Sequence, residues 1–244
     1  MKHDWIVPDW PAPQRIRALI TTRSGGVSSG AFASMNLGEQ AGDEAPACGE
    51  NRARLRALLP AEPLWLRQVH GTAVVEAPAA APGTPADGAV AHVPGAVIAV
   101  LTADCLPVLL CDRQGTAVGV AHAGWRGLAA GVIENTVAKM QIEPQHLIAY
   151  LGPAIGARAY EVGEDVRQAF LNADTQAGAA FAARAPGKYL ADLYQLARQR
   201  LAKTGIMAVH GGGFCTYAEN HRFYSYRRDG PTGRMASLIW IEKL

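Results

Sequence analysis

Two apolar runs in the middle of the chain restrict its fold more than any other feature. They are VIAVLTADCLPVLLCD at residues 97–112 and TAVGVAHAG at residues 116–124, with the turn residues 112–115 between them. Apolar runs of this kind, bounded by turn residues, are typical of buried strands. The short turn that joins them predicts an antiparallel hairpin. We therefore expect the core to contain a sheet built on local hairpins.

The register of this hairpin predicts a contact between Cys105 and His122. A turn that is symmetric about Asp112 and Gly115 places the cysteine directly opposite the histidine on the neighbouring strand. His70, at the end of LWLRQVHG, would approach from a separate strand end. The three side chains are therefore predicted to lie close together.

The ligand chemistry of these three residues favours zinc. One thiolate and two imidazoles suit Zn²⁺, and three protein ligands leave a fourth position for water or substrate, as a catalytic zinc requires. We take His70, Cys105 and His122 as candidate metal ligands, and Cys105 and His122 also as candidate catalytic residues. Residue types and spacing leave an alternative open, in which Cys105 is an apolar core residue and His122 a hydrogen-bonded core histidine.

Asp104 is a further candidate for the catalytic site. It lies beside Cys105, inside the first apolar run. A carboxylate in such a run has to be paired or functional, because burying it without a partner is costly. The alternative is that Asp104 is a turn or cap residue.

Arg126 and Arg23 are the candidate phosphate-binding residues. Arg126 stands at the start of a predicted helix over residues 125–140, where free backbone N–H groups and a guanidinium could hold an anion. Arg23, in TTRSGG, opens a glycine-rich loop that could do the same. Each has an ordinary alternative, a solvated surface charge for Arg126 and a plain turn for the loop of Arg23.

The remaining pattern predicts an α+β protein. Strands outnumber helices and the hairpins are local, which favours α+β over a doubly wound parallel sheet. The linker-like residues 77–86 are few enough to form a surface loop, so we expect residues 1–244 to form a single domain. Further expected elements are strands at 15–22, 64–71, 72–77, 146–151, 206–212, 222–228 and 235–244, helices at 49–59, 164–172 and 191–205, and a loop at 174–187.

Composition narrows the function classes. The formal net charge of +2 creates no field that would attract nucleic acid or a membrane surface, and the basic residues are scattered. The four cysteines are too few and too unevenly spaced for a disulfide framework. The N-terminal MKHDWIVPDWP lacks the apolar run of a signal peptide, and no window is apolar enough to span a bilayer. These features predict a cytoplasmic globular enzyme and give no sign of a nucleic-acid or membrane partner.

A set of motifs resembles one bacterial family closely. TTRSGGVSSG, RQVHG, TADCLPVLL, AHAGWRG, LGPAIG and the C-terminal TYAENHRFYSYRRDGPTGRMASLIW occur in order between about residue 15 and residue 242. Together they resemble the laccase-domain family, whose members were first called multicopper polyphenol oxidases and later described as purine nucleoside phosphorylases. The resemblance implies a zinc site formed by His70 of RQVHG, Cys105 of ADC and His122 of HAGWRG.

The resemblance also implies a fold and a set of activities. The fold would be an α/β/β/α-type layered sandwich with mixed sheets, similar to the catalytic domain of cytotoxic necrotizing factor. The activities would be phosphorolysis of adenosine, inosine, guanosine and methylthioadenosine, with adenosine deamination as a second reaction. A copper-dependent oxidation of phenols is also known in the family.

Copper fits the sequence less well than zinc. A multicopper oxidase needs many histidines, including His-x-His pairs, whereas this chain has seven histidines and no such pair. Three alternatives to a zinc-dependent nucleoside enzyme stay open. They are a metal-free Cys–His hydrolase or amidase acting on a small cell-wall precursor, a copper-dependent polyphenol oxidase, and a binding module with a structural zinc.

Overall fold

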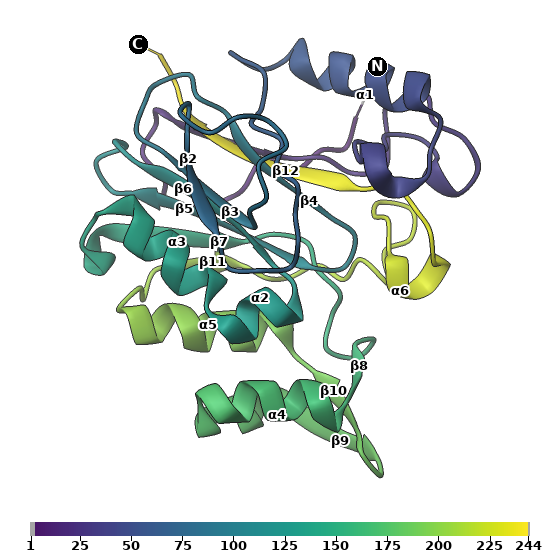
Figure 1. Cartoon of the computed structure of the whole chain (residues 1–244), viewed down its shortest axis with the longest axis vertical. Coiled ribbons are helices and arrows are strands. Elements are labelled where there is room, and N and C mark those ends of the chain that lie inside the picture. The colour runs from purple at the N-terminus through teal and green to yellow at the C-terminus, as the bar shows by residue number, and fades with distance from the viewer. Residues whose placement is uncertain (1–2, 244) are drawn as a thin grey trace.

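Two β-sheets packed face to face form the centre of the protein (Figure 1). The structure is a computed structural model that describes residues 3–243. Within these residues, the smaller sheet has the antiparallel order β1 (Ile16–Ile20), β12 (Met235–Ile241) and β4 (Ile98–Thr102). The larger sheet has the order β11 (Val209–Gly211), β7 (Leu147–Leu151), β5 (Leu106–Asp112), β6 (Val118–Ala123), β3 (Gly88–Ala91) and β2 (Val74–Ala77). It is mixed, because β11–β7 and β2–β3 pair in parallel and the other pairs are antiparallel.

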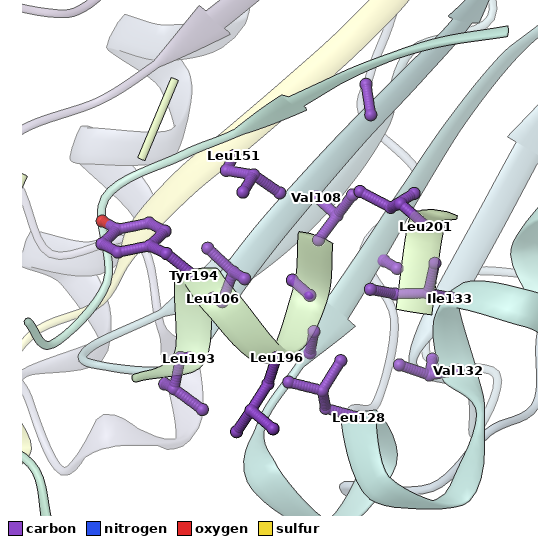
Figure 2. Close-up of a cluster of buried hydrophobic side chains, with 14 of the residues drawn as sticks. Leu106, Val108, Leu128, Val132, Ile133, Leu151, Leu193, Tyr194, Leu196 and Leu201 are labelled. Carbon is purple, nitrogen blue, oxygen red and sulfur yellow. The ribbon is translucent and has the colours of Figure 1, made fainter. Parts of the chain in front are cut away.

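Alternating side chains of β5 build a core on each face of the larger sheet. Leu109 and Cys111 point into the layer between the two sheets, whereas Leu106, Val108 and Leu110 point toward helices. The covering helices are α2 (Trp125–Ala130), α3 (Val132–Met140) and α5 (Leu193–Thr204). Figure 2 shows this helical face, where apolar residues of the strands meet Leu128, Val132, Ile133, Leu193, Leu196 and Leu201.

A helix also covers the outer face of the smaller sheet. Leu55, from α1 (Ala45–Arg56), packs with Met35 and Leu37 against Ala99 and Leu238 of the sheet. The layers therefore follow the order helix, sheet, sheet, helix (Figure 1). The expected mixed α+β sandwich is confirmed, while its likeness to cytotoxic necrotizing factor stays a prediction. Within residues 3–243, no helix combines the length and apolar character needed to cross a membrane.

A smaller unit lies beyond α5 (Figure 1). It consists of α4 (Glu164–Ala173) and the antiparallel sheet β8 (Glu161–Gly163), β10 (Lys188–Ala191) and β9 (Phe181–Ala185). The loop expected at 174–187 is therefore wrong, because this stretch holds the 3-10 helix Thr175–Ala180 and β9. The sequence FAARA shows no apolar alternation, and its strand forms through pairing with β10.

The first apolar run breaks where a single strand was expected. β4 ends at Thr102 and β5 begins at Leu106, and the two strands belong to different sheets. Asp104, with a φ of 90°, stands in the bend between them. The predicted hairpin of β5 and β6 is confirmed, but its register is shifted, because Pro107 and not Cys105 pairs with His122.

Three further expectations need correction. The strand expected at 64–71 is wrong, because this stretch forms only isolated bridges at Leu64 and Arg67. The helix expected at 125–140 is divided into α2 and α3 at Gly131, whose φ is 103°. The strand expected at 222–228 is wrong, because Tyr226–Asp229 form the short helix α6. The Ser225 side chain caps this helix by accepting a hydrogen bond from the Arg228 amide, and β12 pairs with β1 and β4 instead.

Candidate metal centre

The three predicted metal ligands meet at one end of the layer between the sheets. His122 belongs to β6, Cys105 lies in the bend before β5, and His70 follows the segment 64–69. Their ligand atoms all lie within 4.8 Å of one another, and the Cys105 Sγ is 4.0 Å from the His70 Nε2. The register shift places Pro107 opposite His122, and the shared site persists because Cys105, in the bend two residues earlier, still lies beside both histidines.

A buried carboxylate, Asp87, fixes two of the three ligands. Its Oδ1 lies 2.8 Å from the His122 Nδ1, so the Nε2 of this ring is left to face the site. The same carboxylate accepts hydrogen bonds from the backbone amides of Val69, His70 and Gly71. Asp87 was not among the residues predicted for the site. Its position directly before the buried strand β3 is the signal that could have identified it.

Two glycines of AHAGWRG leave space for the ligands. A Cβ on Gly124 would lie 3.0 Å from the Cys105 Sγ and 3.0 Å from the His70 Cδ2. A Cβ on Gly127 would lie 2.7 Å from the Gly71 carbonyl oxygen, so this glycine lets α2 approach the segment that carries His70. Gly127 therefore requires a residue without a side chain, and a side chain at Gly124 would crowd two of the ligands.

Cys105 and His122 strongly shift each other's affinity for protons. Burial alone would raise the pKa of the Cys105 thiol, but the charges and hydrogen bonds of His122 and His70 lower it from 9.0 to about 6. Burial alone would lower the pKa of His122, but Cys105 and Asp87 raise it from 6.5 to about 9. Asp87 itself has a lowered pKa, because hydrogen bonds from His122 and Gly71 outweigh its burial. Without a cation, the pair at neutral pH is a thiolate beside an imidazolium.

The ligands lie on the wall of a cleft with a volume of about 820 Å³. The cleft runs between the bend at residues 103–105, the segment 38–41 and the region of α6. Its lining combines aromatic side chains with arginines. The aromatic residues are Trp65, Trp125, Tyr160 and Tyr226, and the arginines are Arg52, Arg67, Arg227 and Arg234.

Residues 17–242 match the family described as multi-copper polyphenol oxidoreductase laccase. The chain belongs to this family. Curated relatives include a purine nucleoside phosphorylase of Pseudomonas aeruginosa, 54% identical over 98% of both chains. Purine nucleoside phosphorylase YfiH of Escherichia coli is 53% identical over 97% of this chain and 98% of its own length.

Solved structures support the same assignment. A protein of Neisseria meningitidis superposes with a TM-score of 0.95 at 52% identity, covering 98% of this chain and 100% of the other. YlmD from Geobacillus stearothermophilus superposes with a TM-score of 0.92 at 30% identity, covering 99% and 97%. The fold of this laccase-family chain is therefore shared over its whole length.

The donor set of this laccase-family member fits one metal ion. A thiolate, two imidazoles and the Asp87 carboxylate behind His122 are the usual parts of a metal site, and Gly124 leaves space beside the ligand side chains. Among residues 3–243, no second group of histidine, cysteine or acidic side chains brings three or more ligand atoms close enough to share a metal ion. The His70–Cys105–His122 group can therefore bind a metal.

The carboxylate of Asp104 lines the cleft but is held by the protein. Its Oδ1 accepts a hydrogen bond of 2.6 Å from the Thr216 hydroxyl, and its Oδ2 accepts one of 2.7 Å from the Arg227 amide. These bonds tie the bend before β5 to the start of α6. The predicted catalytic role of Asp104 stays a prediction.

Neither predicted phosphate-binding arginine lines the cleft. The guanidinium of Arg23 donates to the carbonyl oxygens of Ala33 and Asn220, and its side chain lines a separate hollow. Arg126 is exposed, with its guanidinium 4.4 Å from the ring centre of Trp125. Arginines distant in sequence from the metal motifs, Arg227 and Arg234 among them, line the cleft instead. Because these arginines are far from the metal motifs in the sequence, sequence analysis did not predict that they line the cleft.

Proposed function

We propose that this chain is a zinc-dependent purine nucleoside phosphorylase. The observation that carries the proposal is the placement of His70, Cys105 and His122 on the wall of a cleft that also presents aromatic rings and arginines. Two curated relatives that span nearly the same length carry the name purine nucleoside phosphorylase, which supports the reaction class. Its substrates would be adenosine, inosine, guanosine and methylthioadenosine, with phosphate as the second substrate.

The lining of the cleft suits the parts of these substrates. A purine can stack on aromatic rings such as Trp125 and Tyr160, which line the same cleft as the metal ligands. Phosphate needs cationic donors, which the arginines of the cleft supply. The cleft volume of about 820 Å³ accommodates both substrates together.

Zinc would be held by His70, Cys105 and His122, and would supply a Lewis acid and an activated water. Asp87 keeps the His122 ring oriented through the hydrogen bond to its Nδ1. We extend the proposal to adenosine deamination as a second reaction, for which the zinc would supply the activated water.

Product analysis of the zinc-loaded protein tests the proposal. Inosine and phosphate should give free hypoxanthine and ribose 1-phosphate, and omission of phosphate should abolish base release. Adenosine without phosphate should give inosine if deamination is the second reaction. Metal analysis should find about one zinc per chain. Four coppers per chain with oxidation of phenols would contradict the proposal in favour of an oxidase.

A second candidate function is a metal-free cysteine hydrolase or amidase. It is favoured by the Cys105–His122–Asp87 alignment, in which a thiolate faces an imidazolium whose other nitrogen contacts a buried carboxylate. Activity that persists in metal-free protein, with an acyl group trapped on Cys105, would favour this candidate. Activity that requires one zinc per chain would contradict it.

A further inference from the structure

Arg234 is held rigidly in the wall of the cleft. Its backbone amide donates a 2.9 Å hydrogen bond to the Asn36 Oδ1, and its Nη1 donates to the carbonyl oxygens of Thr232 and Gly233. The aliphatic stem lies against Gly38, where an added Cβ would come within 2.6 Å of the Arg234 Cγ. The guanidinium is therefore positioned before any ligand arrives.

Two donor atoms of this guanidinium stay available. The Nε and Nη2 of Arg234 have no hydrogen-bond partner within residues 3–243. They are also not buried away from solvent, so a ligand in the cleft can reach them. The side chain lines the same cleft as the metal ligands. These two atoms form the edge of the guanidinium that binds an oxyanion through two parallel hydrogen bonds.

Arg234 also forms no ion pair with the described residues. The Asp104 carboxylate is near enough to act on its charge, but both Asp104 oxygens accept hydrogen bonds from other groups, the Thr216 hydroxyl and the Arg227 amide. The thiolate of Cys105 is nearby, but a bound metal ion would neutralise its charge. A partly buried cation without a partner is unfavourable, so an anion in the cleft would stabilise it.

The other arginines of the cleft differ from Arg234. Arg52 forms an ion pair of 2.6 Å with Glu39. Arg227 donates to the Glu161 carbonyl oxygen and lies over the ring of Tyr160. Arg67 is exposed at the rim. Among these four, Arg234 combines a fixed stem, available donors and the absence of an ion pair with the described residues.

We propose that Arg234 binds the oxyanion in this cleft, inorganic phosphate as the second substrate or a phosphate group carried by a nucleotide. The phosphate arm rests on the proposed function. In phosphorolysis, a phosphate oxygen forms a bond to the anomeric carbon of the ribose while the bond from this carbon to the base nitrogen breaks. The electron pair of the broken bond goes to the base, which takes up a proton. Arg234 would hold the attacking phosphate in place.

Calorimetric titration of zinc-loaded protein with inorganic phosphate tests this assignment without turnover. Arg234→Gln should weaken phosphate binding at least tenfold, on the scale of a lost bidentate charged contact, and should leave zinc content unchanged. Arg17→Gln is the matched control, because Arg17 lies at the opposite end of the same small sheet, where it pairs with Glu242. Arg234→Lys keeps the positive charge but cannot donate two parallel hydrogen bonds, so its loss of phosphate affinity should be intermediate. This variant keeps the assignment testable if Arg234→Gln does not fold.

The arms of the experiment separate the possible results. The assignment would be overturned if wild type, Arg234→Lys and Arg234→Gln bound phosphate with equal affinity. It would also be overturned if wild type bound no phosphate and the Arg234 variants bound nucleotide as tightly as wild type. If the Arg234 variants bind a nucleoside 5′-monophosphate more weakly but bind inorganic phosphate as wild type does, the anion is the phosphate group of a nucleotide. If Arg234 governs phosphate binding but no nucleoside is cleaved, the assignment stands and the proposed phosphorolysis fails. If nucleosides are cleaved with an unchanged phosphate KM in Arg234→Gln, phosphorolysis stands and the assignment fails.

Discussion

Two cysteines at opposite ends of β5 have opposite chemistry. Cys111, near the end of the strand, points into the layer between the sheets, where burial and the charge of Asp112 raise the pKa of its thiol to about 12. Cys105, in the bend before the strand, has a pKa lowered to about 6 by His122 and His70. Both thiols sit in one apolar sequence run, so the strand sets their positions while their neighbours set their reactivity.

The comparison teaches how the chain separates a stable core from a reactive site. Along most of β5, side chains meet apolar partners on both faces. At its start, the bend at Asp104 turns the chain from one sheet to the other and places a cysteine beside two histidines. The packed strand provides rigidity, and the bend provides the position at which polar groups meet.

The largest expected effect is at the reactive end. Cys105→Ala should reduce nucleoside cleavage by roughly 10³-fold or more and should lower the zinc content well below one per chain, because two imidazoles alone bind zinc weakly. Plasma emission analysis and product chromatography give the two readouts. Full zinc content and activity in this variant would remove Cys105 from the site.

Next is a change in the helical core. Leu110→Ala should lower the free energy of unfolding by about 2–5 kcal/mol, because Leu110 is fully buried beneath the covering helices. Denaturant unfolding measures this loss. The folded fraction should still bind one metal ion, since the ligands lie at the far end of the strand. A loss of metal affinity from the folded protein would show that the core and the site are not separable.

Removing the carboxylate behind His122 should have a smaller effect on the site. Asp87→Asn should weaken metal affinity by roughly 10–100-fold, as expected when a group that orients a metal-bound histidine is lost. Competition with a chromogenic chelator measures the affinity. Glu76→Gln is a suitable control, because Glu76 contacts the half-buried His92 and not a predicted ligand. Equal affinities in both variants would contradict the role of Asp87.

The sequence predicted the shared site better than it predicted the geometry around it. The turn residues at 112–115 identified the hairpin of β5 and β6, because turn signals and apolar runs are local. The register and the break at Asp104 could not be read in the same way, since the bend depends on Thr216 and Arg227, which are remote in sequence.

The residues that sequence analysis missed have the same physical origin. Asp87 contacts His122 and the backbone amide of His70, which are distant from it in sequence. Arg234 reaches the cleft from the position just before β12, the middle strand of the smaller sheet. The strand β3, GAVA, was also missed, because a strand that is buried on both faces shows no alternation. Tertiary contacts decide these cases, and the only local sign is the position of Asp87 directly before β3.

A pH profile of alkylation sharpens the comparison of the two thiols. In metal-free protein, the rate at which iodoacetamide modifies Cys105 should rise with a midpoint near pH 6 and not near the ordinary value of 9.0. The sign follows from the lowered pKa, which keeps the thiolate populated until the pH falls below about 6. Mass spectrometry of peptides assigns the modified residue. A midpoint near 9 would contradict the contact with His122, and bound zinc should protect Cys105.

The smallest effect is expected at the buried end. Cys111→Ala should lower the free energy of unfolding by only about 1 kcal/mol, because it removes a single buried sulfur atom from the layer between the sheets. Zinc content and activity should equal those of wild type, since Cys111 faces apolar side chains and not the ligands. Denaturant unfolding, metal analysis and product chromatography on the same preparation measure all three quantities. A loss of zinc in this variant, comparable to that in Cys105→Ala, would mean that the packing of β5 positions the ligands directly and that its two ends form one functional unit.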